Sequence, residues 1–417
     1  MAESKESKVF YGYVVVAVAF LLMLVMWGTY YAFGVFFKPL LEEFGWTRAM
    51  TSGAFSLSFF LTGLLGIFTG RLTDRFGPRI VVTVCGFFLG LGYLLVSQTN
   101  TFWQLYLFYG VVVAMGMSTS VVPLQSTVVR WFVKRRGMMN GIVSAGIGMG
   151  MVVMPPIANW LISIYGWRTS YLVIGITASI LIILLAQFLR RDPGQLGLLP
   201  YGESESKAEL NLPETGFSFW EALHTSQLWI LVVAWYCFCI SVEAVLVHIV
   251  PHAIGLGISA ASAAGILAFI GGLGTGGRVV MGAASDKISI KLSLIIGFSL
   301  LSASFFWLLV AREAWLLYLF VVPFSFGYGG LAALTSPVVA ERFGLRSHGL
   351  ILGVVIFGGT LGEASGPVVA GYIFDITGGY HLAFLTCALI SAAGLMLVLL
   401  LKSTGKEETP YESGRSS

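Results

Sequence analysis

The chain has 417 residues, of which 57% are hydrophobic and only 11% are charged, and its mean hydropathy is +0.87. A soluble domain has about 25% charged residues, so this composition excludes an ordinary soluble enzyme and indicates a membrane protein with many spans. The net charge of +4 comes from basic residues in short loops, and nothing in it suggests nucleic-acid binding. The cysteines lie in apolar runs without zinc-site spacing and are interpreted as small buried hydrophobic residues: Cys85, Cys237, Cys239 and Cys387.

Apolar runs of about 20 residues, the length that crosses a bilayer as a helix, predict an all-α membrane protein. The first run follows a segment that contains acids, and no small-residue cleavage site comes after it, so we interpret it as a retained helix rather than a signal peptide. The twelve predicted spans are residues 10–37, 48–70, 79–98, 102–129, 138–163, 168–189, 226–251, 259–284, 291–311, 314–338, 348–373 and 380–402.

A polar stretch at residues 190–225 separates the sixth predicted span from the seventh. It predicts a cytoplasmic linker between an N-terminal six-helix bundle at 1–189 and a C-terminal one at 226–402, with a tail at 403–417. Loop sequences repeat between the halves: GRLTDRFGPR corresponds to GAASDKISIK, and RWFVKRRG corresponds to ERFGLRSHG. Such repeats are typical of transporters whose substrate site lies between two halves.

The distribution of lysine and arginine predicts the orientation. With both termini in the cytoplasm, 19 of the 24 basic residues lie in cytoplasmic segments and 4 lie outside. This asymmetry follows the positive-inside rule and predicts a multi-pass protein of the cell's inner (plasma) membrane. The one basic residue left over, Arg278, lies at bilayer depth.

An arginine at the centre of a span costs about 2.5–3.5 kcal/mol on insertion scales, so it usually faces a protein interior or an aqueous cavity. Its guanidinium can donate two parallel hydrogen bonds to a carboxylate and stays charged at physiological pH. The residues alone therefore allow two interpretations of Arg278, as an anion ligand or as a permanent ion-pair partner of Glu243 or Glu363.

Several stretches resemble one family of carriers. GRLTDRFGPR is similar to the signature loop of the major facilitator superfamily, and RWFVKRRGMMNGIVSAGIGMG resembles the motif between the fourth and fifth helices of monocarboxylate transporters. FWEALHTSQLW is similar to the segment before the seventh helix of bacterial oxalate/formate antiporters, and SGPVVAGYIFDITGGY fits the end of the eleventh helix in both. The resemblance implies a twelve-helix carrier of small carboxylates whose eighth-helix arginine, here Arg278, binds the carboxylate.

Acids and a histidine in the spans are candidates for proton coupling. Glu243 and Glu363 are the two acids deep in predicted spans, and protonation of either could release Arg278 to bind substrate. His248 could bind the substrate or pass a proton. The alternatives are an acid bonded to a neighbouring helix or facing water, and an interfacial histidine.

The resemblance adds two tyrosines to the candidate substrate-binding residues. Tyr31 and Tyr328 fall where the oxalate/formate antiporters place aromatic pocket residues, and without the resemblance they would be assigned to packing. The antiporter's second cation, a lysine in the eleventh helix, corresponds to about Val355. The helix-one lysine and the acid of animal monocarboxylate carriers correspond to Tyr31 and Gly274. One remaining cation favours a substrate with one carboxylate.

The loops between spans predict a cytoplasmic gate, because in this superfamily similar loops resemble latches between the halves. Simple positive-inside topology is the alternative for many of the basic residues. The candidate gate residues are Gly70, Asp74, Arg75, Gly77, Arg79, Arg130, Lys134, Arg135, Arg136 and Asp286.

We therefore predict a secondary active transporter of small monocarboxylates such as lactate or pyruvate, coupled to protons and working by alternating access as a monomer in the lipid bilayer. No cofactor or metal is expected. An anion exchanger and a carrier of dicarboxylates or other organic anions are the alternatives. A membrane-embedded enzyme is disfavoured, because no nucleotide loop, HExxH-type metal site or Ser/His/Asp set is found.

Overall fold

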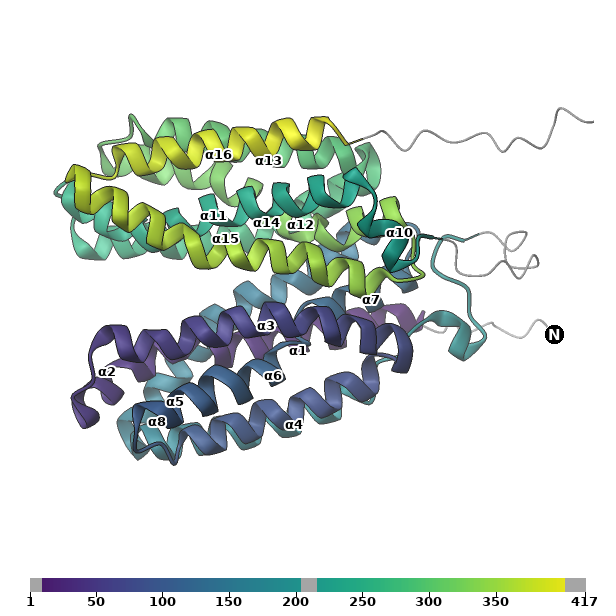
Figure 1. Cartoon of the computed structure of the whole chain (residues 1–417), viewed down its shortest axis with the longest axis horizontal. Helices are drawn as coiled ribbons and strands as arrows, with labels where there is room; N and C mark the ends of the chain where they lie inside the picture. Colours follow the sequence, from purple (N-terminus) through teal and green to yellow (C-terminus); the bar gives the residue numbers. More distant parts are fainter. Residues whose placement is uncertain (1–9, 204–215, 402–417) are drawn as a thin grey trace, which may run out of the picture.

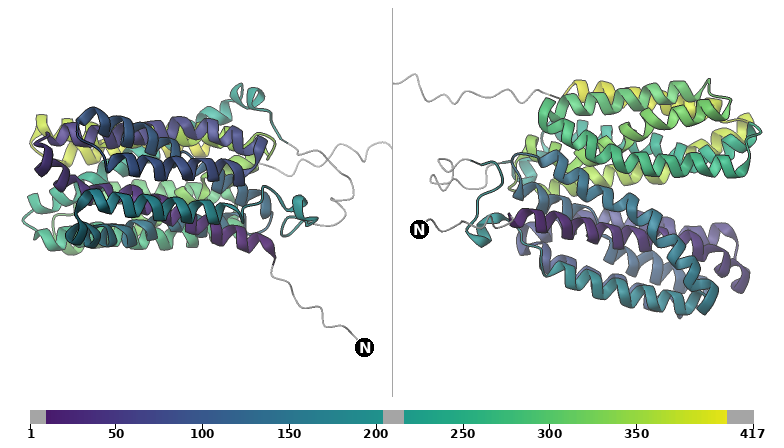
Figure 2. Two further views of the ribbon diagram at one scale, coloured as in Figure 1. Left: turned by 90° about the horizontal axis from the view of Figure 1, so that it is seen from below. Right: turned by 180° about the vertical axis from the view of Figure 1, so that it is seen from behind.

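The computed structural model of the chain describes residues 10–203 and 216–401. Long helices run side by side along the longest axis of the molecule and form two bundles (Figure 1). One bundle is built from the earlier part of the chain and the other from the later part. The view from behind shows the same division (Figure 2).

The first bundle contains the helices before residue 190. Its first span is two consecutive helices, and its fourth span has four segments, one of them the π-helix η1. The helices are α1 (Tyr11–Tyr31), α2 (Phe33–Phe44), α3 (Arg48–Phe76), α4 (Pro78–Val96), α5 (Phe102–Leu105), η1 (Tyr106–Val113), α6 (Ala114–Met117), α7 (Val122–Trp131) and α8 (Arg136–Ala186).

The segment after the first bundle includes a short 3-10 helix, η2 (Pro193–Leu196). The described part of the second bundle has seven helices, of which the short α10 precedes six long uninterrupted ones. They are α10 (Phe219–Leu223), α11 (Ser226–Gly255), α12 (Ala260–Ile288), α13 (Ile290–Leu308), α14 (Ala314–Phe343), α15 (His348–Thr377) and α16 (His381–Leu399).

Eleven helical stretches in the described residues are long and apolar enough to cross a membrane. One of them, α8, has 51 residues, and its backbone leaves the helical conformation at Gly166, where φ is 74°. A helix of about 20 residues already spans a bilayer, so α8 consists of two spans that turn at a glycine free to adopt positive φ. The prediction of an all-α protein with twelve transmembrane helices is confirmed.

Each bundle has its own apolar core. One buried cluster is drawn from residues between Val15 and Leu189, and the other from residues between Ala222 and Leu401 together with Val122. Across the two bundles, α12 packs against α8 and α15 packs against α3. Large apolar side chains such as Phe68 and Phe87 lie exposed on the outside, as expected for a surface that faces lipid. The exact domain boundaries stay a prediction.

The start of α1, residues 190–203 and the end of α16 lie at the same end of the molecule (Figures 1 and 2). We call this the linker end. At this end the Tyr11 hydroxyl of α1 donates to the carbonyl of Phe188 at 2.9 Å, and Lys291 Nζ of α13 donates to the carbonyl of Leu401 after α16. The linker end is also where the two bundles are joined by the polar contacts described below.

Candidate functional site

A cavity lies between the two bundles and encloses about 1070 Å³ of unfilled space, open solvent included. Its walls come from both halves of the chain. Five of the residues predicted for the centre of the protein line it together: Tyr31, Glu243, Arg278, Tyr328 and Glu363.

Arg278 lies on α12 with only 3% of its surface exposed. Its Nη2 donates a hydrogen bond of 3.0 Å to the hydroxyl of Tyr328 on α14, and its Cζ lies 5.0 Å from the centre of that ring. Its Nε has no hydrogen-bond partner, and no described carboxylate lies within 4.0 Å of its nitrogens. The permanent ion pair with Glu243 or Glu363 is therefore absent in this conformation, and the guanidinium keeps donors for an anion.

Glu243 on α11 and Glu363 on α15 are both half-buried at the cavity wall. They lie close enough to interact electrostatically, and the thiol of Cys239 is within hydrogen-bonding reach of Glu363. The described lining thus holds two carboxyl groups and one guanidinium. Such an arrangement can take up a proton and an anion in the same space.

Aromatic rings make up much of the remaining wall. Trp27 and Tyr31 stack with their ring centres 5.5 Å apart, and Trp235 donates from Nε1 to Thr335 Oγ1 at 3.0 Å. The indole Nε1 of Trp27 is buried without a partner. An apolar wall with a few polar groups suits a small organic anion, because charged contacts strengthen where water is excluded.

Gly274 and Val355, where the sequence resemblance implied charged residues in other carriers, are uncharged here for a structural reason. A Cβ at Gly274 would lie 3.2 Å from Cδ1 of Tyr328, so an acidic side chain there would have to displace the tyrosine that bonds Arg278. Val355 on α15 is fully buried in the apolar core of the second bundle. Neither position adds a charged group to the cavity.

His248 is not among the cavity-lining residues. Its Nδ1 lies 3.1 Å from the Tyr380 hydroxyl, and its Nε2 lies 3.0 Å from the carbonyl oxygen of Pro367. Burial raises the pKa of the Tyr380 phenol, so this hydroxyl stays neutral and can donate to the imidazole. Both ring nitrogens are engaged away from Arg278, and the structure does not bring His248 to the other predicted site residues.

The sequence reasoning did not single out the polar side chains that the first bundle contributes to the cavity. Gln125 on α7 is 2% exposed and donates from Nε2 to Ser144 Oγ on α8 at 3.0 Å, while its Oε1 has no partner. The amide of Gln125 inside a predicted apolar span was the sequence feature that could have identified it as a cavity residue. The other overlooked polar lining residues are Thr62, Ser118, Ser120, Thr335 and Thr360.

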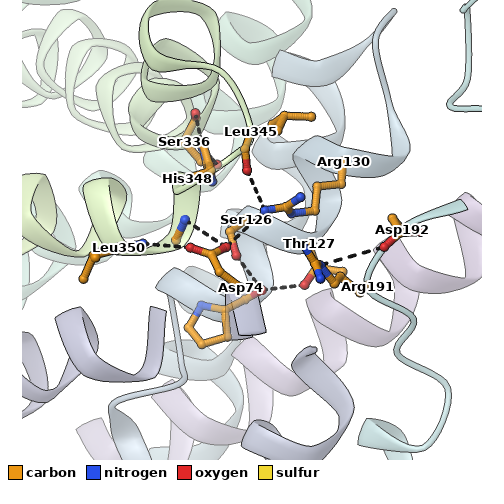
Figure 3. A network of polar contacts seen from close by, with 12 residues as sticks. Asp74, Ser126, Thr127, Arg130, Arg191, Asp192, Ser336, Leu345, His348 and Leu350 are labelled. Carbon is orange, nitrogen blue, oxygen red and sulfur yellow. Dashed lines mark hydrogen bonds and ion pairs between the residues drawn. The ribbon is translucent and has the colours of Figure 1, made fainter. Parts of the chain in front are cut away.

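At the linker end, Asp74 at the end of α3 bonds to the other half of the chain. Its carboxylate accepts hydrogen bonds from the backbone N–H groups of Gly349 and Leu350, each at 3.2 Å, and from Arg130 Nη2 at 3.1 Å. Arg130 also donates to the carbonyl of Leu345 at 2.7 Å. Figure 3 shows this network, in which the acid lies at the N-terminus of α15. An anion there is stabilised by the open N–H groups and the helix dipole.

Asp286 at the end of α12 makes the reciprocal contact. Its carboxylate accepts from the backbone N–H groups of Gly137 at 2.8 Å and Met138 at 2.9 Å, at the N-terminus of α8. Each half thus provides an acid that binds the second and third residues of a helix in the other half. Nearer the cavity, Ser336 Oγ donates to the carbonyl of Gln125 at 3.2 Å.

Glycines allow the halves to approach closely at this end. A Cβ at Gly70 would collide with the backbone of Gly349. Gly77 has φ 82°, which suits the turn between α3 and α4. Gly70 thus permits close packing of α3 against α15, and Gly77 forms the turn after the end of α3 that carries Asp74.

The other predicted gate residues make contacts within the first half. Arg79 Nε donates to Gln187 Oε1 at 2.8 Å, and Arg136 Nε donates to the carbonyls of Val129 and Phe132. Two further arginines contact aromatic rings. Cζ of Arg75 lies 5.1 Å from the ring centre of Phe76, and Cζ of Arg135 lies 5.6 Å from the ring centre of Tyr201. The backbone N–H of Lys134 donates to the carbonyl of Tyr201.

Comparison with known proteins agrees with this architecture. The sequence profile of the Major Facilitator Superfamily matches residues 18–332 and 279–416. The chain is 28% identical over 393 residues to the oxalate:formate antiporter of Oxalobacter formigenes, with 91% of this chain and 88% of that protein covered. It is 25% identical over 438 residues to monocarboxylate transporter 2 of Homo sapiens, with 98% and 90% covered.

Among solved structures, a double-tryptophan mutant of XylE matches with a TM-score of 0.80 at 14% identity, covering 95% of this chain and 97% of that one. At this identity the match shows the fold alone. A two-bundle membrane fold whose halves enclose a cavity with a few polar and charged groups is typical of membrane transporters. The chain belongs to the Major Facilitator Superfamily. It is a multi-pass secondary transporter of that family, and not an enzyme.

Proposed function

We propose that the chain transports small monocarboxylates, such as lactate or pyruvate, together with protons. The observation that carries the proposal is Arg278, a buried guanidinium in the central cavity with a free Nε and no described ion-pair partner. Tyr328 orients it through a 3.0 Å hydrogen bond. The similarity to an oxalate:formate antiporter and to monocarboxylate transporters supports a carboxylate as the anion.

The charges of the cavity support proton coupling. With Glu243 and Glu363 both ionised, the described lining has a net charge of −1, and an added carboxylate would bring it to −2. Like charges repel strongly in a space of low effective dielectric constant. A proton that enters with each anion removes one negative charge, so the loaded carrier can reorient with less electrostatic cost.

The linker end is the cytoplasmic end in this proposal, because 19 of the 24 basic residues lie in segments on that side. Asp74 and Asp286 then act as a cytoplasmic gate that opens once per cycle. The described contacts at this end correspond to a closed cytoplasmic gate. We further propose that the protein works as a monomer in the cell's inner (plasma) membrane.

A carboxylate exchanger is the second candidate, favoured by the 28% identity to the oxalate:formate antiporter. Val355, fully buried in an apolar core, argues against a second cation for a dicarboxylate at that position. In an exchanger no proton would replace substrate, and only loaded carriers would reorient.

Uptake of labelled lactate into proteoliposomes tests the proposal. We expect an inward proton gradient to drive accumulation without any internal carboxylate. Uptake that ignores the proton gradient and requires an internal anion would instead establish exchange. If neither lactate nor pyruvate is taken up under any of these conditions, the proposed substrate class is wrong.

A further inference from the structure

The fourth membrane span, Phe102–Trp131, is interrupted near the middle of its length. Helix α6 ends at Met117 and α7 begins at Val122, and the four residues between them form turns. The equivalent span of the second bundle, α14, is continuous over Ala314–Phe343 although it contains two prolines. Non-helical backbone at membrane depth is tolerated where it is buried in protein or lines a water-filled cavity. Here it lines the central cavity, through residues 118, 120 and 121.

The break exposes the N-terminus of α7 to the cavity. Val121, the N-cap, makes no side-chain hydrogen bond to the helix, and Pro123 in the first turn has no N–H. The N–H groups of a helix's first turn have no partner within the helix, and Val121 and Val122 at this end of α7 line the cavity. Helix N-termini of this kind have a partial positive charge and bind oxygen anions or dipoles.

A second observation points to a ligand at the same place. The amide oxygen of Gln125, one turn into α7, is buried and has no partner, and so is Nε of Arg278. Both residues line the cavity and both contact one face of α8. Gln125 bonds Ser144, and a Cβ at Gly148, one turn further, would lie 3.4 Å from Arg278 Nη1. Gln125 and Arg278 therefore lie at successive turns of α8, on the wall of the same cavity.

We propose that this break is a second subsite, which binds the oxygen on the carbon next to the substrate's carboxylate. The inference rests on the proposed function, in which Arg278 holds that carboxylate. The open N–H groups of α7 donate to a keto or hydroxyl oxygen, and Gln125 Oε1 accepts from a hydroxyl. The preferred substrates are then 2-hydroxy and 2-oxo monocarboxylates rather than unsubstituted ones.

Competition against labelled lactate uptake, in proteoliposomes with the full chain, tests this subsite. Lactate can use both the donors and Gln125, pyruvate only the donors, and propionate neither. We expect the inhibition constants to rise from lactate to pyruvate to propionate. Propionate should bind at least about tenfold more weakly than lactate, as for the loss of one or two hydrogen bonds.

Two variants separate the parts of the subsite. Gln125→Leu removes the hydrogen-bond acceptor for a hydroxyl group. We expect the inhibition constant of lactate to rise until it is close to that of pyruvate. Val121→Asn places an amide side chain at the N-cap of α7, beside the N–H groups at the cavity, and we expect it to weaken the binding of lactate and pyruvate more than that of propionate. Val133→Asn makes the same exchange at an exposed position outside the cavity lining and is the matched control, with the wild-type order retained.

The outcomes distinguish this inference from the function on which it rests. If propionate competes as well as lactate for the wild-type protein, the proposed subsite is wrong. The proposed function would then stand as a carrier of monocarboxylates in general. Variants that weaken all three acids equally would also overturn it, because a merely structural role acts on every substrate alike. If no carboxylate competes at all, the proposed function itself fails.

Discussion

Tyr328 on α14 fixes the guanidinium of Arg278 on α12 from two directions. Its hydroxyl accepts from Nη2 at 3.0 Å, and its ring lies 5.0 Å from Cζ, within the range of a cation–π contact. The two residues are 50 positions apart in the chain. The pair leaves Nε without a partner, so the arginine is held in place before an anion arrives.

Arg278→Lys should nearly abolish transport. Lysine keeps the charge but loses the planar fork that binds both carboxylate oxygens, and hydrogen bonds to charged groups are the stronger ones. We expect uptake of lactate to fall between about 10- and 100-fold at unchanged expression in the membrane. Arg312→Lys, at an exposed turn, is the control. Near-normal binding of lactate by Arg278→Lys would contradict the assignment.

Tyr328→Phe should have a smaller effect on the same step. The ring and its cation–π contact remain, while the hydroxyl that orients Arg278 is lost. We expect the apparent KM for lactate to rise roughly fivefold, as for the loss of one hydrogen bond, with the maximal rate changed less. Tyr318→Phe removes a hydroxyl of the same helix that bonds Ser262, and it should leave KM unchanged. An equal loss in both variants would point to packing instead.

The number of spans and the charged residues inside them could be predicted from the sequence, because the bilayer restricts both strongly. Apolar runs of sufficient length become helices, and a charge in such a run must face an interior. That reasoning led to Arg278, Glu243 and Glu363, which the fold brings to one cavity. His248 differs because its partners, Pro367 and Tyr380, lie more than 100 residues away and satisfy it elsewhere.

The break in the fourth span was not predicted, since residues 102–129 are predominantly apolar and predict one helix. The signals were weak but present. Three consecutive hydroxyl residues, Ser118, Thr119 and Ser120, can bond nearby backbone and compete with a helix, and Pro123 lacks an N–H. In the structure the Ser118 and Thr119 hydroxyls bond the carbonyls of Met115 and Gly116. Helix α14 stays continuous although it contains Pro323 and Pro337, so a proline alone does not determine whether a span is interrupted.

Replacing both Glu243 and Glu363 with glutamine should uncouple transport from protons. Glutamine retains the size and polarity of each side chain but cannot take up a proton. The described lining then keeps only the charge of Arg278, so the loaded carrier is neutral and reorients, while the empty carrier holds an uncompensated positive charge. We expect accumulation driven by the proton gradient to disappear, while exchange of internal for external lactate continues. Glu313→Gln, at an exposed position, is the control. Proton-driven accumulation at the wild-type level in the double variant would exclude these acids as carriers of the proton.

Asp74→Ala and Asp286→Ala should each open the linker end. Each removes an acid that accepts two backbone N–H groups of a helix in the other half. Loss of an acidic cap costs about 0.5–2 kcal/mol, so the closed population should fall between about two- and thirtyfold relative to the open one. Spin labels at Val133 and Ile288, exposed at the linker end of opposite halves, should report longer distances by pulsed electron paramagnetic resonance. Asp192→Ala removes an acid that caps η2 within residues 190–203 and should leave the distances unchanged. If the distances of the Asp74 and Asp286 variants also match the wild type, these acids do not hold the halves together.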